Sequence, residues 1–151
     1  ESGHKPVAIC GTEGFMVRYA RCCHPLPGDA IEGYLSPEKG MVVHRQQCKN
    51  LADLRDNAER LVALQWDEEV DGEYMVALRI EVENRRGMIA VIATRINSMG
   101  VNIEKINTEV KDYQFTYVDI ELMVEDRVHL ARIMKRLRTI NHVLKVNRVK
   151  N

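Results

Sequence analysis

The segment YMVALRIEVENRRGMIAVIATRINSMG, residues 74–100, changes its hydrophobic period from two residues to between three and four. In its first part, apolar residues alternate with mostly polar ones, which is typical of a strand that buries one face. The apolar positions of this strand are Val76, Leu78, Ile80 and Val82. From Met88 to Met99 the spacing predicts an amphipathic helix that ends at Gly100, with an apolar stripe of Ile89, Ile92, Ala93 and Ile96.

The sequence after residue 100 repeats this alternation of strand and helix. Residues 101–110 are predicted as a second strand, and Asp112 makes a turn into a third. One face of the third strand carries Val118, Ile120, Leu122 and Val124. Asp126 is expected to cap a helix with core positions at Leu130, Ile133, Met134 and Leu137, and residues 143–149 form a last strand. The order βαββαβ predicts a ferredoxin-like fold, an antiparallel sheet with two helices on one face.

An acidic segment without hydrophobic periodicity, residues 67–72, precedes this unit and ends in glycine. Residues 1–72 carry 8 basic and 12 acidic side chains, whereas residues 73–151 carry 14 and 10. Both observations indicate a boundary between two domains, because composition and charge change there together. We therefore expect domains at residues 1–70 and 71–151.

The first domain is predicted to be small and rich in strands. Strands are expected over residues 6–10 and 15–20, a turn over 11–14, and a hairpin of residues 31–35 and 41–44. The prolines and the glycine of residues 25–29 predict a tight turn. One short helix would contain Leu51, Leu54 and Arg55, capped by Asn50, and residues 62–66 would form a closing strand. The whole chain is thus expected to be of the α+β class.

Four soft ligand groups occur in the first domain: Cys22, Cys23, His44 and Cys48. They have the number and type that a tetrahedral zinc site requires, and Cys48 near a helix start gains thiolate character. Neighbouring residues of a strand point to opposite faces, so both thiols of the adjacent pair reach one ion only if the backbone is irregular there. In the alternative interpretation, Cys22 and Cys10 are core side chains, while His44 and Cys48 position the hairpin and the helix start.

The composition of the 151 residues is that of a globular protein, with a formal net charge of zero. No apolar run approaches the roughly 20 residues that cross a bilayer, and no charged and apolar leader begins the chain, so we expect a soluble, cytoplasmic protein. Two of the four cysteines are neighbours, which favours reduced thiols over disulfides. Glu1, Ser2 and Gly3 are typical of a cut within a linker, which predicts a fragment of a larger protein.

Catalytic motifs are sparse. His44 with Cys22, Cys23 or Cys48 is formally a nucleophile and base pair, but no third orienting group is recognisable. Neither Gly-x-x-x-x-Gly-Lys nor Gly-x-Gly-x-x-Gly occurs. The sequence therefore predicts a binding or regulatory chain rather than an enzyme.

Two segments, YARCCHPLPGDAIEGY (residues 19–34) and GMVVHRQQCKN (residues 40–50), carry a family resemblance. They are similar to the zinc-finger-type, or ribosome-intersubunit, domain of the bifunctional RelA/SpoT (p)ppGpp synthetase/hydrolases. The βαββαβ unit resembles the ACT domain of the same family. This resemblance implies that hydrolase and synthetase domains lie upstream and that the chain is regulatory.

The resemblance also implies particular sites and partners. It places metal ligands at Cys22, Cys23, His44 and Cys48, contacts to ribosomal RNA in the cysteine domain, and a homodimer through the ACT domain. An amino-acid site would lie in the loop after the first ACT strand, with these residues: Asn84, Gly87, Met88, Ile89 and, nearby, Asn102.

The amino-acid site also has a physical argument. Gly87 precedes a helix N-terminus, where free N–H groups favour a carboxylate, and Ile89 with Ile103 would form a pocket for a branched side chain. Alternatively, Gly87 only makes the turn and the isoleucines belong to the core.

RNA contact has two candidate surfaces. Tyr113, Phe115 and Tyr117 share one strand face, but Glu81 and Glu83 on that face would repel phosphate, which favours a dimer or interdomain face. Basic residues around the cysteines offer phosphate contacts instead: Arg21, Arg45 and Lys49. A stand-alone RNA-binding module and an amino-acid sensor are thus the alternatives to control of upstream domains.

Overall fold

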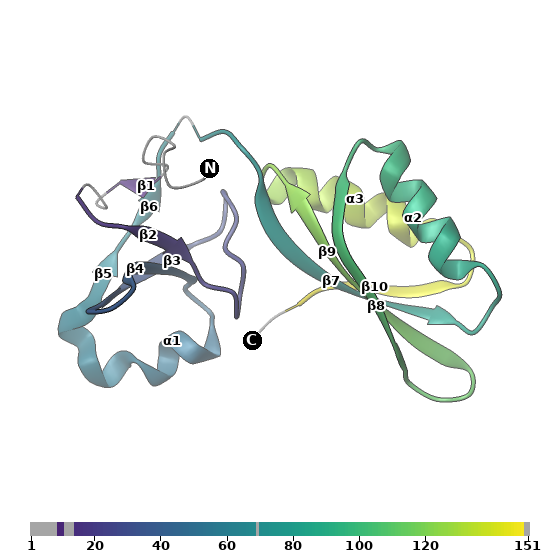
Figure 1. Cartoon of the computed structure of the whole chain (residues 1–151), viewed down its shortest axis with the longest axis horizontal. Helices are drawn as coiled ribbons and strands as arrows, with labels where there is room; N and C mark the ends of the chain where they lie inside the picture. The colour runs from purple at the N-terminus through teal and green to yellow at the C-terminus, as the bar shows by residue number, and fades with distance from the viewer. Residues whose placement is uncertain (1–8, 11–13, 69, 150–151) are drawn as a thin grey trace. The chain divides into compact units, whose positions relative to one another are not determined.

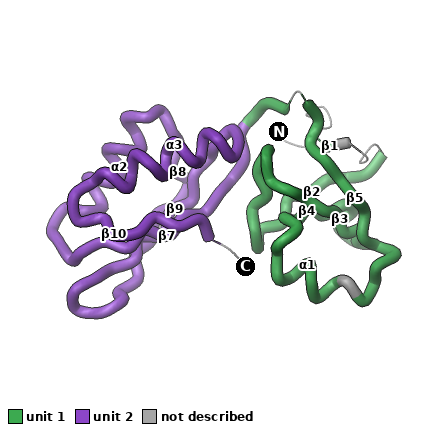
Figure 2. The backbone as a smooth tube through the Cα atoms, turned by 180° about the vertical axis from the view of Figure 1, so that it is seen from behind, with its two compact units in different colours: residues 1–72, 150–151 green, residues 73–149 purple. Residues whose placement is uncertain are grey.

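The computed structural model describes residues 9–10, 14–68 and 70–149. The chain forms two compact units, residues 1–72 with 150–151 and residues 73–149 (Figure 2). We call the first the cysteine unit and the second the βαββαβ unit. The strand predicted from residue 6 and the turn predicted over residues 11–14 lie in part outside the described residues.

The βαββαβ unit has the predicted order of elements. Its strands are β7 (Tyr74–Glu83), β8 (Asn102–Val110), β9 (Phe115–Val124) and β10 (Val143–Arg148), and its helices are α2 (Met88–Ser98) and α3 (Arg127–Arg138). The strands form one antiparallel sheet in the order β10-β7-β9-β8. Both helices cover the same face of this sheet (Figure 1). The predicted ferredoxin-like fold is confirmed.

The core of this unit lies between the sheet and the helices. The alternating residues of β7 and β9 are buried as predicted, and they meet Leu130, Ile133 and Leu137 of α3. The predicted stripe of α2 is wrong at one position, because Ile89 is 44% exposed and Met88 is buried instead. Gly87, with φ of 83°, is the N-cap of the helix, and Met88, Ile92 and Ile96 are its buried residues.

Two capping predictions hold in this unit. Gly100 adopts a φ of 73° directly after α2, a conformation that favours glycine. The Asp126 carboxylate accepts a hydrogen bond from the His129 backbone N–H at 2.7 Å and so caps α3.

The cysteine unit is built on a second four-stranded sheet. Its strands are β2 (Val17–Tyr19), β3 (Ile31–Ser36), β4 (Gly40–Arg45) and β5 (Leu61–Ala63), in the order β2-β4-β3-β5. The β3–β4 hairpin is antiparallel, as predicted, and β2 lies parallel to β4. A separate pair joins β1 (Ile9–Cys10) to β6 (Gln65–Trp66). The predicted closing strand is therefore divided in two, because its ends pair with different partners.

One α-helix, α1 (Lys49–Asp53), follows the hairpin, and a 3₁₀ segment (Arg55–Arg60) continues from it. The predicted cap at Asn50 is wrong. The N-cap is Cys48, and Asn50 lies within the first turn.

Both faces of the β3–β4 hairpin carry apolar residues. One face packs Ile31, Met41 and Val43 with Ile9 and Leu64. The other face meets a smaller cluster of buried residues, Ala20, Cys23, Cys48 and Leu51. The cysteines therefore lie in a small core of their own. Within the described residues, no helix is long and apolar enough to span a membrane.

The position of α2 on the sheet gives a direct prediction. Ile92→Ala removes a fully buried side chain and should lower the free energy of unfolding by about 2–5 kcal/mol. The matched control Ile89→Ala, on the exposed side of the same helix, should change it by less than about 0.5 kcal/mol. Urea denaturation followed by the amide NMR signals of β7 and β9 measures both. An equal loss for both variants would contradict the assigned phase of α2.

Candidate metal centre

The adjacent cysteines lie in a turn that follows β2. The Ala20 N–H donates to the Val43 carbonyl at 2.9 Å, which keeps the chain beside β4, and the His24 N–H then donates to the Ala20 carbonyl at 2.9 Å. His24 has a φ of 45°, outside the strand region. This irregular backbone lets Cys22 and Cys23 approach one point, the condition that the sequence set for a shared ion.

The other two groups come from the hairpin and the helix that follows it. His44 belongs to β4, and Cys48 is the N-cap of α1. Between them the chain turns tightly, since the Cys48 N–H donates to the Arg45 carbonyl at 3.0 Å. Three short segments thus converge, and each is held by backbone hydrogen bonds.

The four ligand atoms lie within 4.8 Å of one another. Cys22 Sγ is 3.5 Å from Cys48 Sγ and 3.6 Å from His44 Nδ1, and Cys23 Sγ is 3.9 Å from the same nitrogen. Around a tetrahedral zinc ion, with Zn–S near 2.3 Å, ligand atoms are about 3.5–3.8 Å apart. The residues present fit a zinc ion with three sulfur ligands and one nitrogen ligand.

Burial and local hydrogen bonds set the protonation of these groups. Burial lowers the pKa of His44, so its imidazole is neutral, as a metal ligand must be. Burial raises the pKa of Cys23 to about 12, and it also raises the pKa of Cys22. For Cys48, burial is outweighed by hydrogen bonds from the Leu51 backbone and Cys22, and its pKa is lowered. The thiolate character predicted for Cys48 is therefore present.

Apolar packing explains only part of this arrangement. Cys23 and Cys48 are indeed buried as small hydrophobic residues would be, whereas Cys22 is only half-buried, and the side chain of Cys10 lies outside the described residues. Packing gives no reason for the His44 nitrogen to face two thiols. Metal coordination does.

Asp29 connects two chain segments beside the cysteine cluster. From the sequence, it was identified only as a turn residue. Its carboxylate accepts from the Leu26 N–H at 2.7 Å and lies 3.8 Å from Arg45 Nε. Arg45 follows the ligand His44, and its backbone N–H donates to Cys23 Sγ at 3.3 Å. Asp29 therefore ties the proline-rich turn to the end of β4, and the signal for it is the spacing Pro-x-Pro-Gly-Asp.

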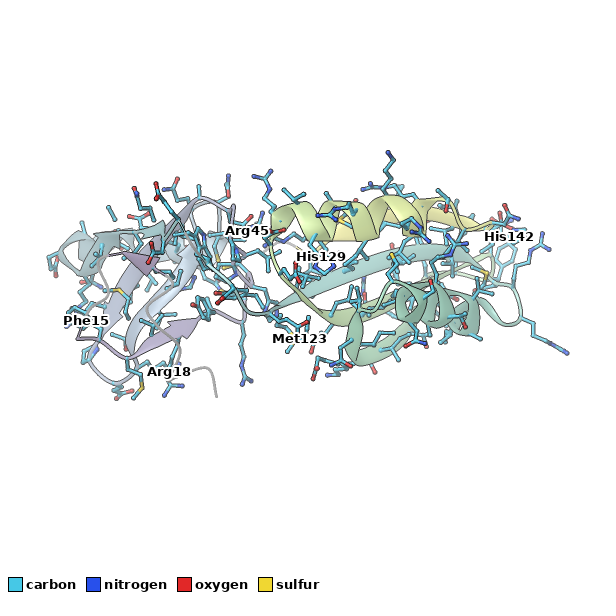
Figure 3. The ribbon with its side chains drawn as sticks, turned by 90° about the horizontal axis from the view of Figure 1, so that it is seen from above. Phe15, Arg18, Arg45, Met123, His129 and His142 are labelled. Atoms are coloured by element: carbon cyan, nitrogen blue, oxygen red, sulfur yellow. The ribbon has the colours of Figure 1, made fainter. Side chains whose placement is uncertain are left out.

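The three candidate RNA contacts differ in the exposure of their side chains. Arg21 and Lys49 are exposed beside the ligand residues. The Arg45 side chain is only 15% exposed and is oriented by Asp29. Figure 3 shows Arg45 and Arg18 at well-separated places on the cysteine unit. Arg21 and Lys49 are accordingly better placed for phosphate than Arg45.

In the βαββαβ unit, the loop before α2 is an open surface. A Cβ atom on Gly87 would meet nothing within 4 Å, and Ile89 is exposed, while Met88 is turned into the core. The Asn84 side chain is engaged by the β8–β9 hairpin. Its amide donates to the Tyr113 carbonyl at 2.8 Å, and its oxygen accepts from the Thr116 hydroxyl.

The structure does not bring Asn102 to this loop within one chain. Asn102 pairs with Met123, which pairs with Met75 near the beginning of β7. The loop with Gly87 follows the other end of β7, where Glu83 pairs with Phe115. Asn102 and Gly87 therefore lie at opposite ends of the sheet. The same holds for Ile103, the neighbour of Asn102, so it forms no pocket wall with Ile89 in one copy.

The open face of the sheet is covered by paired charges. Arg79 donates to Asp119 at 2.8 and 2.9 Å and to Glu109 at 2.6 Å, and its guanidinium lies 4.1 Å from the centre of the Tyr117 ring. The expectation that Glu81 repels phosphate needs correction, because Glu81 is buried and bound to Lys111 at 3.0 Å. Of the predicted aromatic row, Tyr113 is 88% exposed but lies outside β9.

Comparisons with known proteins agree with this division into two units. Residues 7–67 match the family model of the RelA/SpoT RIS domain, and residues 71–148 match that of an ACT domain. The bifunctional (p)ppGpp synthase/hydrolase SpoT of Escherichia coli K12 is 38% identical over 149 residues, which are 99% of this chain and 21% of that protein. The GTP pyrophosphokinase of Myxococcus xanthus is 30% identical over 98% of this chain and 19% of its own length.

The comparison of structures finds the ACT domain of the GTP pyrophosphokinase of Chlorobium tepidum. It is 26% identical, with a TM-score of 0.46, and the match covers 52% of this chain and all of that domain.

The fold, the cysteine cluster and these matches define a regulatory region made of a RIS domain and an ACT domain. The chain belongs to the RelA/SpoT family and corresponds to its C-terminal regulatory region. It spans about a fifth of the length of the curated relatives that it matches.

The geometry predicts one zinc ion per chain, lost when a ligand is replaced. His44→Asn should lower zinc affinity at least about tenfold, whereas His142→Asn, at a left-handed position that asparagine tolerates, should leave it unchanged. Because the raised pKa values keep Cys22 and Cys23 protonated at pH 7, zinc binding must release their protons, and affinity must rise with pH.

Calorimetry in buffers of different ionisation enthalpy measures both quantities. Retained zinc in His44→Asn, or binding without proton release, would contradict the assigned ligands.

Proposed function

We propose that this chain controls catalytic domains of a (p)ppGpp synthetase/hydrolase upstream in the same protein and has no catalytic role of its own. Control would act through contact with the ribosome, through dimerisation, or through a bound amino acid. Each of these shifts the populations of states in which the regulatory region packs differently on the catalytic domains.

The proposal rests on the matches to two regulatory domains, RIS and ACT. It also rests on the 38% identity to SpoT of Escherichia coli over nearly the whole chain. The geometry of the metal centre supports it. Four protein ligands saturate a tetrahedral zinc ion, whereas a catalytic zinc keeps one position open for water or substrate. Zinc here would stabilise the fold of the cysteine unit rather than act on a substrate.

Contact with ribosomal RNA is supported by exposed cations in the cysteine unit. Arg21 and Lys49 flank the ligand residues Cys22 and Cys48, and neither is engaged in an ion pair like that of Arg45. The sheet of the βαββαβ unit is less suited to phosphate, because Arg79 and Lys111 beside its aromatic rings already bind carboxylates. RNA contact would therefore involve the cysteine unit.

Dimerisation is supported by the edge of the sheet in the βαββαβ unit. β8 is an edge strand, and Val110 on it is 74% exposed, while Ile89 and Val91 of the neighbouring helix are 44% and 45% exposed. An unpaired strand edge with apolar neighbours favours pairing with another strand.

Antiparallel pairing of β8 from two copies would also complete the amino-acid site. In such a pair the start of one β8 lies beside the end of the other. Asn102 of one copy would then approach the end of β7 and the Gly87 loop of the second. The carboxylate of a branched-chain amino acid would bind the N–H groups at the start of α2, and its side chain would pack on Ile89.

Control of catalysis is tested in the full-length parent protein. Charge reversal of the exposed cations, Arg21→Glu with Lys49→Glu, should change the ratio of (p)ppGpp synthesis to hydrolysis in the presence of ribosomes at least severalfold. The charge reversal Lys145→Glu, on an exposed lysine of the βαββαβ unit, is the control. An unchanged ratio, or (p)ppGpp turnover by the 151-residue chain alone, would contradict the proposal.

A substitution that prevents dimerisation should also abolish amino-acid binding. Val110→Asp places a charge at the β8 edge and should convert a dimer to a monomer and abolish valine binding. Val128→Asp, on a valine of α3 that is also largely exposed, should affect neither. Asn102→Ala should abolish valine binding and leave the dimer intact. Sedimentation and calorimetry measure the two properties. Valine binding by the Val110→Asp monomer would refute the shared site.

A further inference from the structure

The three thiols of the metal cluster differ in their access to solvent. A groove of about 320 Å³ opens on the surface of the cysteine unit, and its lining includes Cys22 and His44. Cys22 is half-buried, whereas Cys23 and Cys48 lie outside this lining and are only 2% and 3% exposed. A small molecule that enters the groove from solvent therefore meets the Cys22 sulfur first.

The surroundings of Cys22 carry positive charge. The lining of the groove contains Arg21 and Lys39, whose side chains are exposed, and the described residues of this lining include no carboxylate. Arg21 also directly precedes Cys22 in the chain. Reactive cysteine thiolates in proteins occupy such partly exposed, electropositive surroundings. Cys22 therefore has the setting of a reactive thiol as well as that of a metal ligand.

Cys48 is the sulfur that is placed to bond with Cys22. The two Sγ atoms are 3.5 Å apart, so about 1.5 Å remains to be closed for a disulfide bond. Cys23 is a poorer partner, because the Cα atoms of sequence neighbours are about 3.8 Å apart, less than the roughly 4.4–6.8 Å that disulfides span. The Cys23 sulfur is also held by the Arg45 backbone N–H at 3.3 Å.

We propose that Cys22 and Cys48 are an oxidation site, at which a peroxide converts the two thiolates to a disulfide and the metal ion is lost. The Cys22 thiolate attacks one oxygen of hydrogen peroxide, the O–O bond breaks, and hydroxide leaves, which gives a sulfenic acid. The Cys48 thiolate then attacks the Cys22 sulfur, forms the S–S bond and displaces a second hydroxide. Two electrons pass from the two sulfurs to the peroxide, and no further reactant is needed.

The disulfide removes two of the four metal ligands. Thiolates are the metal-binding form of cysteine, so only Cys23 and His44 remain to hold an ion. A structural zinc site uses four protein ligands, and two do not retain the ion. The disulfide still joins the turn after β2 to the start of α1, while the end of β4, which carries His44, loses its link to both. Peroxide would thus change how the three segments of the cysteine unit are joined.

This inference goes beyond the proposed function, because it concerns the oxidation state of the cluster and not the partners of the chain. Its failure would leave both the zinc site and the control of catalysis intact.

The test treats the reduced, zinc-loaded 151-residue chain with hydrogen peroxide. The intact mass should fall by two hydrogen atoms, and tandem mass spectrometry of a digest should place the new bond between Cys22 and Cys48. A colorimetric chelator should detect one zinc ion released for each disulfide formed. Dithiothreitol with added zinc should restore the starting state. Four results would overturn the inference: no disulfide, a disulfide with zinc retained, a sulfinic acid in place of the disulfide, or a bond that uses Cys10, Cys23 or a second chain.

Two serine variants form a matched pair, because each removes one candidate metal ligand. Cys23→Ser keeps both proposed partners and should still form the disulfide, whereas Cys22→Ser lacks one partner and should form none. Mass spectrometry measures the yield in each variant, so the comparison does not depend on the zinc that either variant holds. Equal yields of disulfide in the two variants would contradict the assigned pair.

Discussion

The cysteine unit depends on one point at which three chain segments meet. The turn after β2, the end of β4 and the start of α1 place four ligand atoms within 4.8 Å. A domain this small buries a limited apolar surface, and a metal cross-link is a common way to supply the remaining stability. Burial raises the pKa values of Cys22 and Cys23, so these two thiols remain protonated at neutral pH without a metal. The exposed cations Arg21 and Lys49 take their positions from the same segments.

The βαββαβ unit is stabilised in a different way. Its core is continuous between the sheet and two helices, and it needs no cross-link. What it leaves open is the edge at β8 and the loop before α2. Because Asn102 and Gly87 lie at opposite ends of the sheet, a site that uses both requires two copies. Association and ligand binding would thus be linked in this unit, while the cysteine unit would act through its charged surface.

The spacing of apolar residues along the sequence was sufficient to predict the βαββαβ fold, because each strand and helix buries one regular face. It did not fix the phase of α2. The spacing of Ile89, Ile92 and Ile96 and that of Met88, Ile92 and Ile96 both suit a helix, and the packing of α2 in the folded unit decides between them. Residues 62–66 likewise alternate as one strand, but the break at Leu64 depends on two partners, β3 and β1, that are distant in sequence.

The candidate metal ligands could be named from their residue type and number and from the family resemblance, although adjacent cysteines are an uncommon spacing for zinc. Their support could not be named, since the pair of Asp29 and Arg45 arises from residues whose approach only the fold creates. Local pattern thus predicts elements and ligands, while pairing between distant segments determines the surfaces on which function depends.

X-ray absorption at the zinc edge of the purified chain tests the central claim most directly, because it reports the atoms around the metal. The account predicts a first shell of three sulfur atoms at about 2.3 Å and one nitrogen at about 2.0–2.1 Å. A shell dominated by oxygen or nitrogen, or a chain that retains its fold and holds no zinc, would contradict it.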